Sequence, residues 1–202
     1  MRLFYALECR PEDRKRIQPI VDTALAGAPG GRRVRPENLH VTLIFVGEVD
    51  PARSVGLHDA LLEAYRSAQS DAPPAFPMLL ECGKPGMFRQ GRGGVLWLGV
   101  DPAPSLLRFH RLLSGILVRE GLVSGVGRSL FPHITVARDV PFRHMPEEGG
   151  GNPEEQDPVP PKVMLHFEGP ALMESARDPR TGAVRYVPRC RPAEGPRWIE
   201  NP

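Results

Sequence analysis

The stretch LHVTLIFVG, residues 39–47, places a histidine two residues before a threonine inside an otherwise apolar run, and PHITVAR, residues 132–138, repeats the pattern. Short apolar runs of this kind are typical of buried strands. Because residues i and i+2 of a strand point to the same face, His40 shares a face with Thr42, and His133 shares a face with Thr135. The sequence therefore predicts two strands that each carry an imidazole and a hydroxyl on one side.

Composition alone does not account for the repeated motif. The chain has six histidines and four threonines among 202 residues, which gives roughly 0.12 expected His-x-Thr matches, the false-positive check that a short motif needs. One such motif would be interpreted as a core histidine with a satisfied hydrogen bond. Two of them in matched strand contexts favour a functional pair.

The remaining patterns predict an α+β fold with a largely antiparallel sheet, because many strand patterns are interleaved with only three helical ones. We expect helices at 11–27, 50–69 and 101–121, and strands at 2–9, 33–47, 75–83, 94–100, 131–140, 162–169, 171–175 and 183–187. The Gly- and Arg-rich stretch at 84–94 is predicted to be a mobile loop. The stretch at 146–161, rich in Pro, Gly and Glu, is predicted to be a disordered acidic loop.

The two halves of the chain follow a similar plan. Each begins with an apolar strand, continues through a helix and reaches a His-x-Thr strand; Leu3 lies 37 positions before His40, and Val95 lies 38 positions before His133. This spacing indicates a faint internal duplication. We therefore expect one domain over residues 1–202, made of two pseudo-repeated lobes, with both motifs facing a central cleft.

Composition narrows the class of protein. The hydrophobic content of 41% and the charged content of 25% are ordinary for a globular protein, and no apolar run approaches the roughly 18 residues that span a bilayer. The N-terminus becomes charged too early for a secretory leader, so we expect a cytoplasmic protein. A net charge of +2 does not by itself indicate nucleic-acid binding. Three scattered cysteines argue against a disulfide framework and against a thiolate zinc site.

Two histidines and two hydroxyls facing one cleft suit metal-free hydrolysis of a phosphodiester. A neutral imidazole takes a proton from water while a protonated one gives a proton to the leaving oxygen, and hydroxyl groups donate to the phosphate oxygens. The sequence shows no carboxylate cluster for magnesium and no His-rich zinc motif, so no metal and no cofactor is expected.

The paired motifs HVTLIFVG and HITVAR resemble the signatures of the two-histidine (2H) phosphoesterases, and within them the RNA 2′,3′-cyclic phosphodiesterases, historically called 2′-5′ RNA ligases. The similarity extends to RLFYAL, PENLHVTLIFVGEV, GVLWLGV and ALMESARDPRTGAVRY. It implies the bilobal LigT-like fold, with two pseudo-symmetric, largely antiparallel sheets, outer helices and a central cleft. By this resemblance His40 is the proton donor, His133 is the proton acceptor, and Thr42 and Thr135 bind phosphate, with Arg138 as a further phosphate ligand. The expected product is a 2′-phosphomonoester, and reverse 2′-5′ ligation is chemically allowed.

The resemblance implies a monomer that acts on RNA or a nucleotide with a 2′,3′-cyclic phosphate end, without a membrane. Two alternatives stay open: the same chemistry on a cyclic nucleotide, a 2′-5′ oligoadenylate or an ADP-ribose cyclic phosphate, and a non-catalytic RNA-binding module. Strict alternation places Arg138 on the face opposite His133, so it reaches the cleft only if the strand ends or twists near Ala137.

Two groups of residues beside the motifs are further candidates for RNA contacts. Arg32, Arg33 and Arg35 precede the first motif, where they could steer an RNA backbone electrostatically. In the Gly-rich stretch, aromatic and basic side chains could stack on or clamp a base; these are Phe88, Arg89 and Arg92. For both groups a solvated surface role is the competing interpretation.

Overall fold

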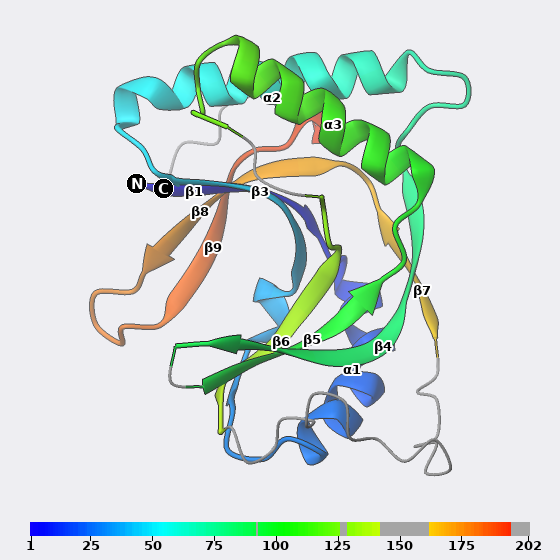
Figure 1. The fold of residues 1–202 in the computed structure, drawn as a ribbon, viewed down its shortest axis with the longest axis vertical. Coiled ribbons are helices and arrows are strands. Elements are labelled where there is room, and N and C mark those ends of the chain that lie inside the picture. The colour runs from blue at the N-terminus through cyan, green and yellow to red at the C-terminus, as the bar shows by residue number, and fades with distance from the viewer. Residues whose placement is uncertain (92, 126–128, 142–161, 195–202) are drawn as a thin grey trace.

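The structure is a computed structural model that describes residues 1–91, 93–125, 129–141 and 162–194. Strands dominate it, as the α+β prediction requires (Figure 1). The α-helices of the described residues are α1 (Pro11–Ala26), α2 (Ser54–Gln69) and α3 (Pro104–Arg119). The strands are β1 (Arg2–Glu8), β2 (Arg32–Arg33), β3 (His40–Glu48), β4 (Met78–Gln90), β5 (Gly93–Val100), β6 (His133–Val140), β7 (Val163–Phe167), β8 (Pro170–Arg177) and β9 (Val184–Cys190).

The sheet consists of two four-stranded arms, β7-β4-β5-β6 and β3-β1-β8-β9, and β2 pairs with β6 outside this path. Every pairing is antiparallel. The two sheets expected from the sequence are therefore the two arms of one continuous sheet, which β3 and β6 join through the pair Val41 and Ile134. In Figure 1, α2 and α3 lie together above the strands and α1 lies below them, so the helices cover the outside.

Each motif strand contains a β-bulge at the same place. In β3 the register with β1 shifts between Thr42 and Ile44, and in β6 the register with β5 shifts between Thr135 and Ala137. A bulge sets two residues of one strand opposite one residue of its neighbour, which reverses the alternation of side chains beyond it. Accordingly the two residues after each threonine are both buried: Leu43 and Ile44 in β3, and Val136 and Ala137 in β6. The two motif strands therefore share the same irregularity, and the internal repeat stays a prediction.

The prediction of a mobile loop at 84–94 is wrong for its described part. Strand β4 continues to Gln90 and forms a hairpin with β5, in which Gly86 lies opposite Trp97. A Cβ atom at Gly86 would lie 2.2 Å from the Trp97 indole, so this glycine lets the ring lie flat across the neighbouring strand. Glycine in this stretch suggested a loop, but Gly86 is needed because the Trp97 ring packs directly against its backbone.

The core is continuous between the helices and the sheet. α1 contributes Ile17 and Val21, and α3 contributes Phe109 and Leu113, all of them buried. Inside the core the Asp13 carboxylate accepts hydrogen bonds from Arg10, from Arg16 and from the backbone N–H of His166 on β7. These bonds tie α1 to the edge of the sheet. Within the described ranges, none of the helices has the length and apolar content needed to cross a membrane.

The close approach of Gly86 to Trp97 gives a stability prediction. Replacing Gly86 with Ala should destabilise the protein by about 1–3 kcal/mol, because the added methyl group overlaps a ring that has little room to move. The matched control is Gly115→Ala in α3, where nothing lies within 4 Å of the new Cβ. That change should stabilise the helix by about 0.5–1 kcal/mol. Urea unfolding curves measure both, and equal stability of Gly86→Ala and the parent protein would contradict the packing argument.

Candidate active site

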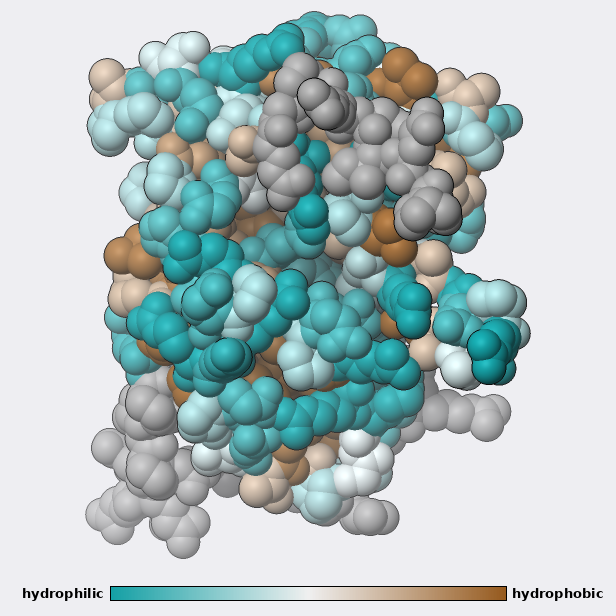
Figure 2. All heavy atoms as spheres, turned by 180° about the vertical axis from the view of Figure 1, so that it is seen from behind, coloured by the Kyte–Doolittle hydropathy of each residue, from teal (hydrophilic) through white to brown (hydrophobic). Residues whose placement is uncertain are grey.

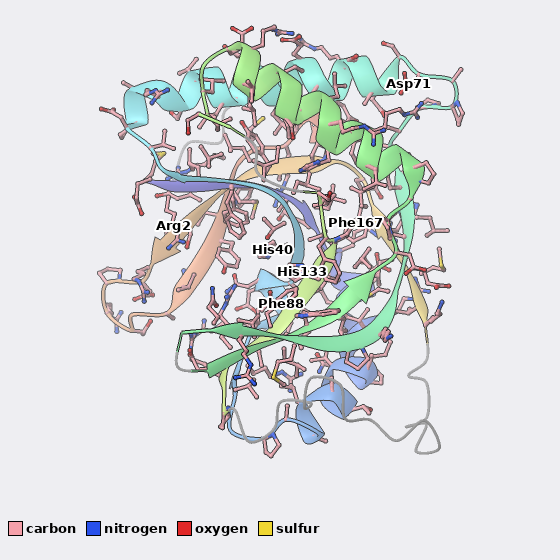
Figure 3. The ribbon with its side chains drawn as sticks, in the orientation of Figure 1. Arg2, His40, Asp71, Phe88, His133 and Phe167 are labelled. Atoms are coloured by element: carbon pink, nitrogen blue, oxygen red, sulfur yellow. The ribbon has the colours of Figure 1, made fainter. Side chains whose placement is uncertain are left out.

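The pairing of β3 with β6 brings the two motifs together. With Val41 opposite Ile134, extending the antiparallel register by one residue in each direction sets His40 opposite Thr135 and Thr42 opposite His133. All four side chains then lie on one face, and the two histidines occupy diagonal positions about 7–8 Å apart. Figure 3 places His40 and His133 close together in the space between the two arms. Extended from this one pair, the register brings together the four residues that the sequence analysis expects to share a cleft.

Both imidazole rings are held by the same type of hydrogen bond. The Nδ1 atom of His40 lies 2.7 Å from the carbonyl oxygen of Asn38, and the Nδ1 atom of His133 lies 2.9 Å from the carbonyl oxygen of Phe131. A carbonyl only accepts, so Nδ1 carries the hydrogen in both rings, and Nε2 carries the lone pair of the neutral form. The fold thus orients each ring through the residue two positions before it.

The Thr42 hydroxyl lies beside the reactive nitrogen of its own motif. Its Oγ1 atom is 3.0 Å from His40 Nε2. Since Nδ1–H already donates to Asn38, the Thr42 hydroxyl donates to Nε2 when the ring is neutral. In the second motif Thr135 is half-buried on the same face of the sheet. Both hydroxyls therefore border the space between the imidazoles.

Aromatic rings enclose each histidine. Around His40, the Tyr186 ring stands edge-on at 4.9 Å and the Phe4 ring lies at 5.1 Å. Around His133, the three nearby rings are Phe88 at 5.2 Å, Phe131 at 5.9 Å and Trp97 at 6.1 Å. Such apolar walls keep water away from the imidazoles and disfavour their charged forms.

Burial accordingly lowers both pKa values. For His40 the pKa is lowered from 6.5 to about 4, and loss of hydration is the largest cause. The Asn38 carbonyl opposes this effect, whereas the charges of Arg138 and His133 add to it. For His133, loss of hydration again lowers the pKa, with a smaller contribution of the same sign from Arg138. Both rings are therefore mainly neutral at pH 7 when no anion lies between them.

Arg138 reaches the cleft because of the bulge in β6. The bulge adds one residue after Thr135, so Arg138 lies on the face of His133 rather than on the opposite face. Arg138 and His40 line one cavity of about 770 Å³, and the guanidinium is close enough to lower the pKa of both histidines. The guanidinium donates to the neutral side-chain amide oxygen of Gln90, at 3.4 Å. The bulge therefore provides the change of face that Arg138 needs to reach the cleft.

The other candidates fall in different places. Phe88 is part of strand β4 and packs against His133 rather than lying in a loop (Figure 3). Arg89 is on the same strand and is exposed. Arg92 lies outside the described residues, as does the 146–161 segment. The arginines before the first motif, Arg32, Arg33 and Arg35, line a neighbouring cavity of about 520 Å³.

Asn38 is a site residue that sequence analysis missed. Its carbonyl orients His40, while its side chain donates to the carbonyl of Val184 at 2.9 Å and accepts from the backbone N–H of Tyr186 at 3.3 Å. Asn38 thereby fixes β9, and with it the Tyr186 ring, against His40. The partner strand is almost 150 residues away, so no local sequence signal indicates this contact.

The described residues contain no group of three or more His, Cys, Asp and Glu side chains with the geometry to hold a metal ion. The three cysteines, Cys9, Cys82 and Cys190, are buried and unpaired. Burial raises the pKa of the Cys82 and Cys190 thiols to about 12, so both stay protonated at neutral pH. The imidazoles of the two motifs are therefore the candidates for proton transfer.

Residues 10–147 match the family model of the 2′-5′ RNA ligase superfamily. The RNA 2′,3′-cyclic phosphodiesterase of Escherichia coli (strain K12) is 34% identical over 140 residues, which is 68% of this chain and 72% of that protein. The protein of the same name from Archaeoglobus fulgidus is 30% identical over 141 residues, with coverages of 68% and 72%. The crystal structure of E. coli LigT complexed with 3′-AMP superposes with a TM-score of 0.64 at 27% identity, over 93% of this chain and 94% of that chain.

The depressed pKa of His40 makes stability depend on pH. Between about pH 6.5 and about pH 4, His40 binds a proton in the unfolded chain but stays neutral in the folded protein. Lowering the pH through this window therefore favours unfolding. We expect the protein to lose about 3 kcal/mol more between pH 7 and pH 4 than a His40→Gln variant does. Urea unfolding of the two proteins across this range measures the difference. Parallel stability curves would show that His40 titrates normally in the folded protein.

Proposed function

The chain belongs to the 2′-5′ RNA ligase superfamily, and we propose that it is an RNA 2′,3′-cyclic phosphodiesterase that forms 2′-phosphomonoester ends. The observation that carries this proposal is the matched pair of imidazoles, each with Nδ1–H bound to a backbone carbonyl and Nε2 left for chemistry. Acid–base hydrolysis of a phosphodiester needs two such nitrogens on either side of one phosphorus atom. A separation of roughly 7–8 Å between diagonal positions leaves room for that group.

In the proposed reaction His133 acts as the base and His40 as the acid. Nε2 of His133 takes a proton from water as the water oxygen bonds to phosphorus. The bond between phosphorus and O3′ breaks, and Nε2–H of His40 gives its proton to O3′. The products are a 2′-phosphomonoester and a 3′-hydroxyl, and exchange with solvent returns the two histidines to their starting forms. With the 5′-hydroxyl of another RNA in place of water, the same step would form a 2′-5′ linkage.

Thr42, Thr135 and Arg138 are proposed to hold the non-bridging oxygens of the phosphate. Hydroxyl and guanidinium donors form short, charge-assisted hydrogen bonds with phosphate oxygens. Thr42 already donates to His40 Nε2, so rotation of this hydroxyl toward the phosphate would free Nε2 for its proton. Arg138 lines the same cavity as His40 and, because of the bulge, lies on the face of His133, so its guanidinium offers several donors to the phosphate.

Because both pKa values are lowered, we propose that the substrate phosphate itself helps to protonate His40. The base must be neutral, and burial already keeps His133 neutral at pH 7. The acid must be protonated, whereas His40 alone is neutral at this pH because its pKa is about 4. A phosphate anion beside the ring favours the imidazolium, so binding of the cyclic phosphate raises the pKa of the group that has to act as the acid.

Loss of either imidazole is the direct test of this function. With adenosine 2′,3′-cyclic phosphate as substrate and EDTA present, His40→Ala and His133→Ala should each lower kcat by roughly 10²–10⁴-fold, because each removes one proton-transfer group. The matched control is His166→Ala on β7, which should retain activity. Product analysis should give the 2′-phosphate. Inhibition by EDTA would overturn metal-free catalysis, and unchanged rates in both variants would overturn the site.

Asn38 gives a second prediction, as a residue that positions His40. Asn38→Ala should lower kcat about tenfold, because it releases β9 and lets the His40 ring move away from its productive orientation. Water entering beside the loosened Tyr186 should also raise the pKa of His40 toward 6.5. An NMR titration of the imidazole protons measures this shift, with His133 as the internal control. A lower kcat without a shift in the His40 pKa would contradict the positioning role.

A further inference from the structure

A basic groove continues from the histidine cleft along one side of the molecule. The cavity that contains His40 and the neighbouring cavity of about 520 Å³ share five lining residues: Arg32, Arg138, Arg177, Val184 and Tyr186. The second cavity lies between β2 with the segment after it and the hairpin of β8 and β9. Seen from behind, this hairpin projects as a hydrophilic lobe at the right edge, separated from the body by a notch (Figure 2).

The charge of this groove is one-sided. Five guanidinium groups line the second cavity, from Arg32, Arg33, Arg35, Arg138 and Arg177. Among the described residues that line it, none is an aspartate or a glutamate. Like charges crowded into a concave surface raise the local potential and attract an extended polyanion.

The ion pairs that these arginines make are weak and exchangeable. Arg32 pairs with Asp139 at 3.1 Å and Arg33 pairs with Asp22 at 2.9 Å. Arg35 pairs with Glu37 at 3.9 Å, and every residue in these pairs is about half exposed or more. Exposed pairs of this kind contribute little to stability, so a phosphate can replace the carboxylate at small cost. Arg177 donates to the Gly182 carbonyl at 3.3 Å and has no carboxylate partner in the described part of the chain.

The direction of the proposed reaction shows which part of a substrate meets this groove. O3′ leaves toward His40, so the ribose lies on the His40 side of the phosphorus and the water lies on the His133 side. The RNA chain continues from the 5′ carbon of that ribose, in the cavity that His40 and Arg138 share with Tyr186. From there the described surface leads into the arginine-lined cavity.

We propose that the groove between β2 and the β8–β9 hairpin binds the phosphodiester backbone of the nucleotides that precede the cyclic phosphate. This inference rests on the proposed function. Arginine forks suit phosphate oxygens, and backbone contacts of this kind recognise a single strand without reading its bases. The protein should therefore prefer an oligoribonucleotide to a mononucleotide that carries the same reactive end.

The test compares two substrates with the same terminal base: adenosine 2′,3′-cyclic phosphate, and a pentaribonucleotide that ends in adenosine 2′,3′-cyclic phosphate. The variants are Arg33→Ala and Arg177→Ala, both exposed positions. The matched control is Arg66→Ala on the outer surface of α2, which removes the same charge elsewhere. The readout is the ratio of kcat/KM for the pentaribonucleotide to kcat/KM for the mononucleotide.

We expect each groove variant to lower this ratio by roughly fivefold or more, because each removes a charge-assisted hydrogen bond to phosphate, while Arg66→Ala leaves the ratio unchanged. The salt dependence gives a second readout. For the pentaribonucleotide, the slope of log KM against log salt should become shallower by about 0.7 for each phosphate that the variant no longer neutralises. Arg177→Lys should recover most of the salt slope, because it keeps the charge.

The outcomes separate the groove from the catalytic function. An unchanged ratio in both groove variants would overturn the proposed role of the groove. An equal fall in kcat/KM on both substrates would also overturn it, because it would place these arginines at the reacting phosphate. If the parent protein turned over neither substrate, the proposed function would fail. In that case fluorescence anisotropy with the labelled pentaribonucleotide still decides the groove: weaker binding by the two variants alone supports it, and equal binding by all of the proteins rejects it.

Discussion

Strands β3 and β6 meet at the single pair of Val41 and Ile134, and the whole site is arranged about that contact. Both side chains are fully buried, so the pairing is fixed from the core side of the sheet. An antiparallel pair of strands is related by a twofold rotation, and here the axis passes through the pair of Val41 and Ile134. Each histidine therefore comes to lie opposite the threonine of the other motif. A shift of either strand by one residue would turn the histidine and the threonine of that strand into the core. The apolar residues of both motifs thus decide where the imidazoles stand.

The electrostatics of the cleft follow from that placement. Burial is the main reason why both imidazoles favour their neutral forms, and the charge of Arg138 acts in the same direction on each of them. The protein alone therefore presents hydrogen-bond donors and neutral bases around the space between the two histidines. A phosphate reverses the balance, because its charge offsets the guanidinium and stabilises an imidazolium. This arrangement favours an anionic ligand between the two histidines.

Much of this was readable from the sequence. The strands predicted at 33–47 and 131–140 follow from their apolar runs, and the spacing of His40 and Thr42 predicts a shared face. The position of Arg138 was not readable, because alternation gives the wrong face and the bulge that corrects it depends on how β5 packs against β6. The loop prediction at 84–94 was wrong for a similar reason. Glycine is common both in loops and where two segments pack closely, and only the position of Trp97 shows that Gly86 belongs to the second case. Contacts such as that of Asn38 with β9 depend on topology, which local patterns do not specify.

The two motif strands match in their register shifts but differ at one position beside the site. The bulges place Phe45 in β3 and Arg138 in β6 at equivalent positions, three residues after each threonine, and both line the cavity beside His40. Both halves carry the histidine and the threonine, whereas this third position is aromatic in one half and basic in the other. An RNA end is itself asymmetric, with a ribose and its chain on one side of the phosphorus and water on the other. In the proposed reaction the two motifs supply the two proton-transfer groups, and the different residues at this third position would set which way the substrate lies between them.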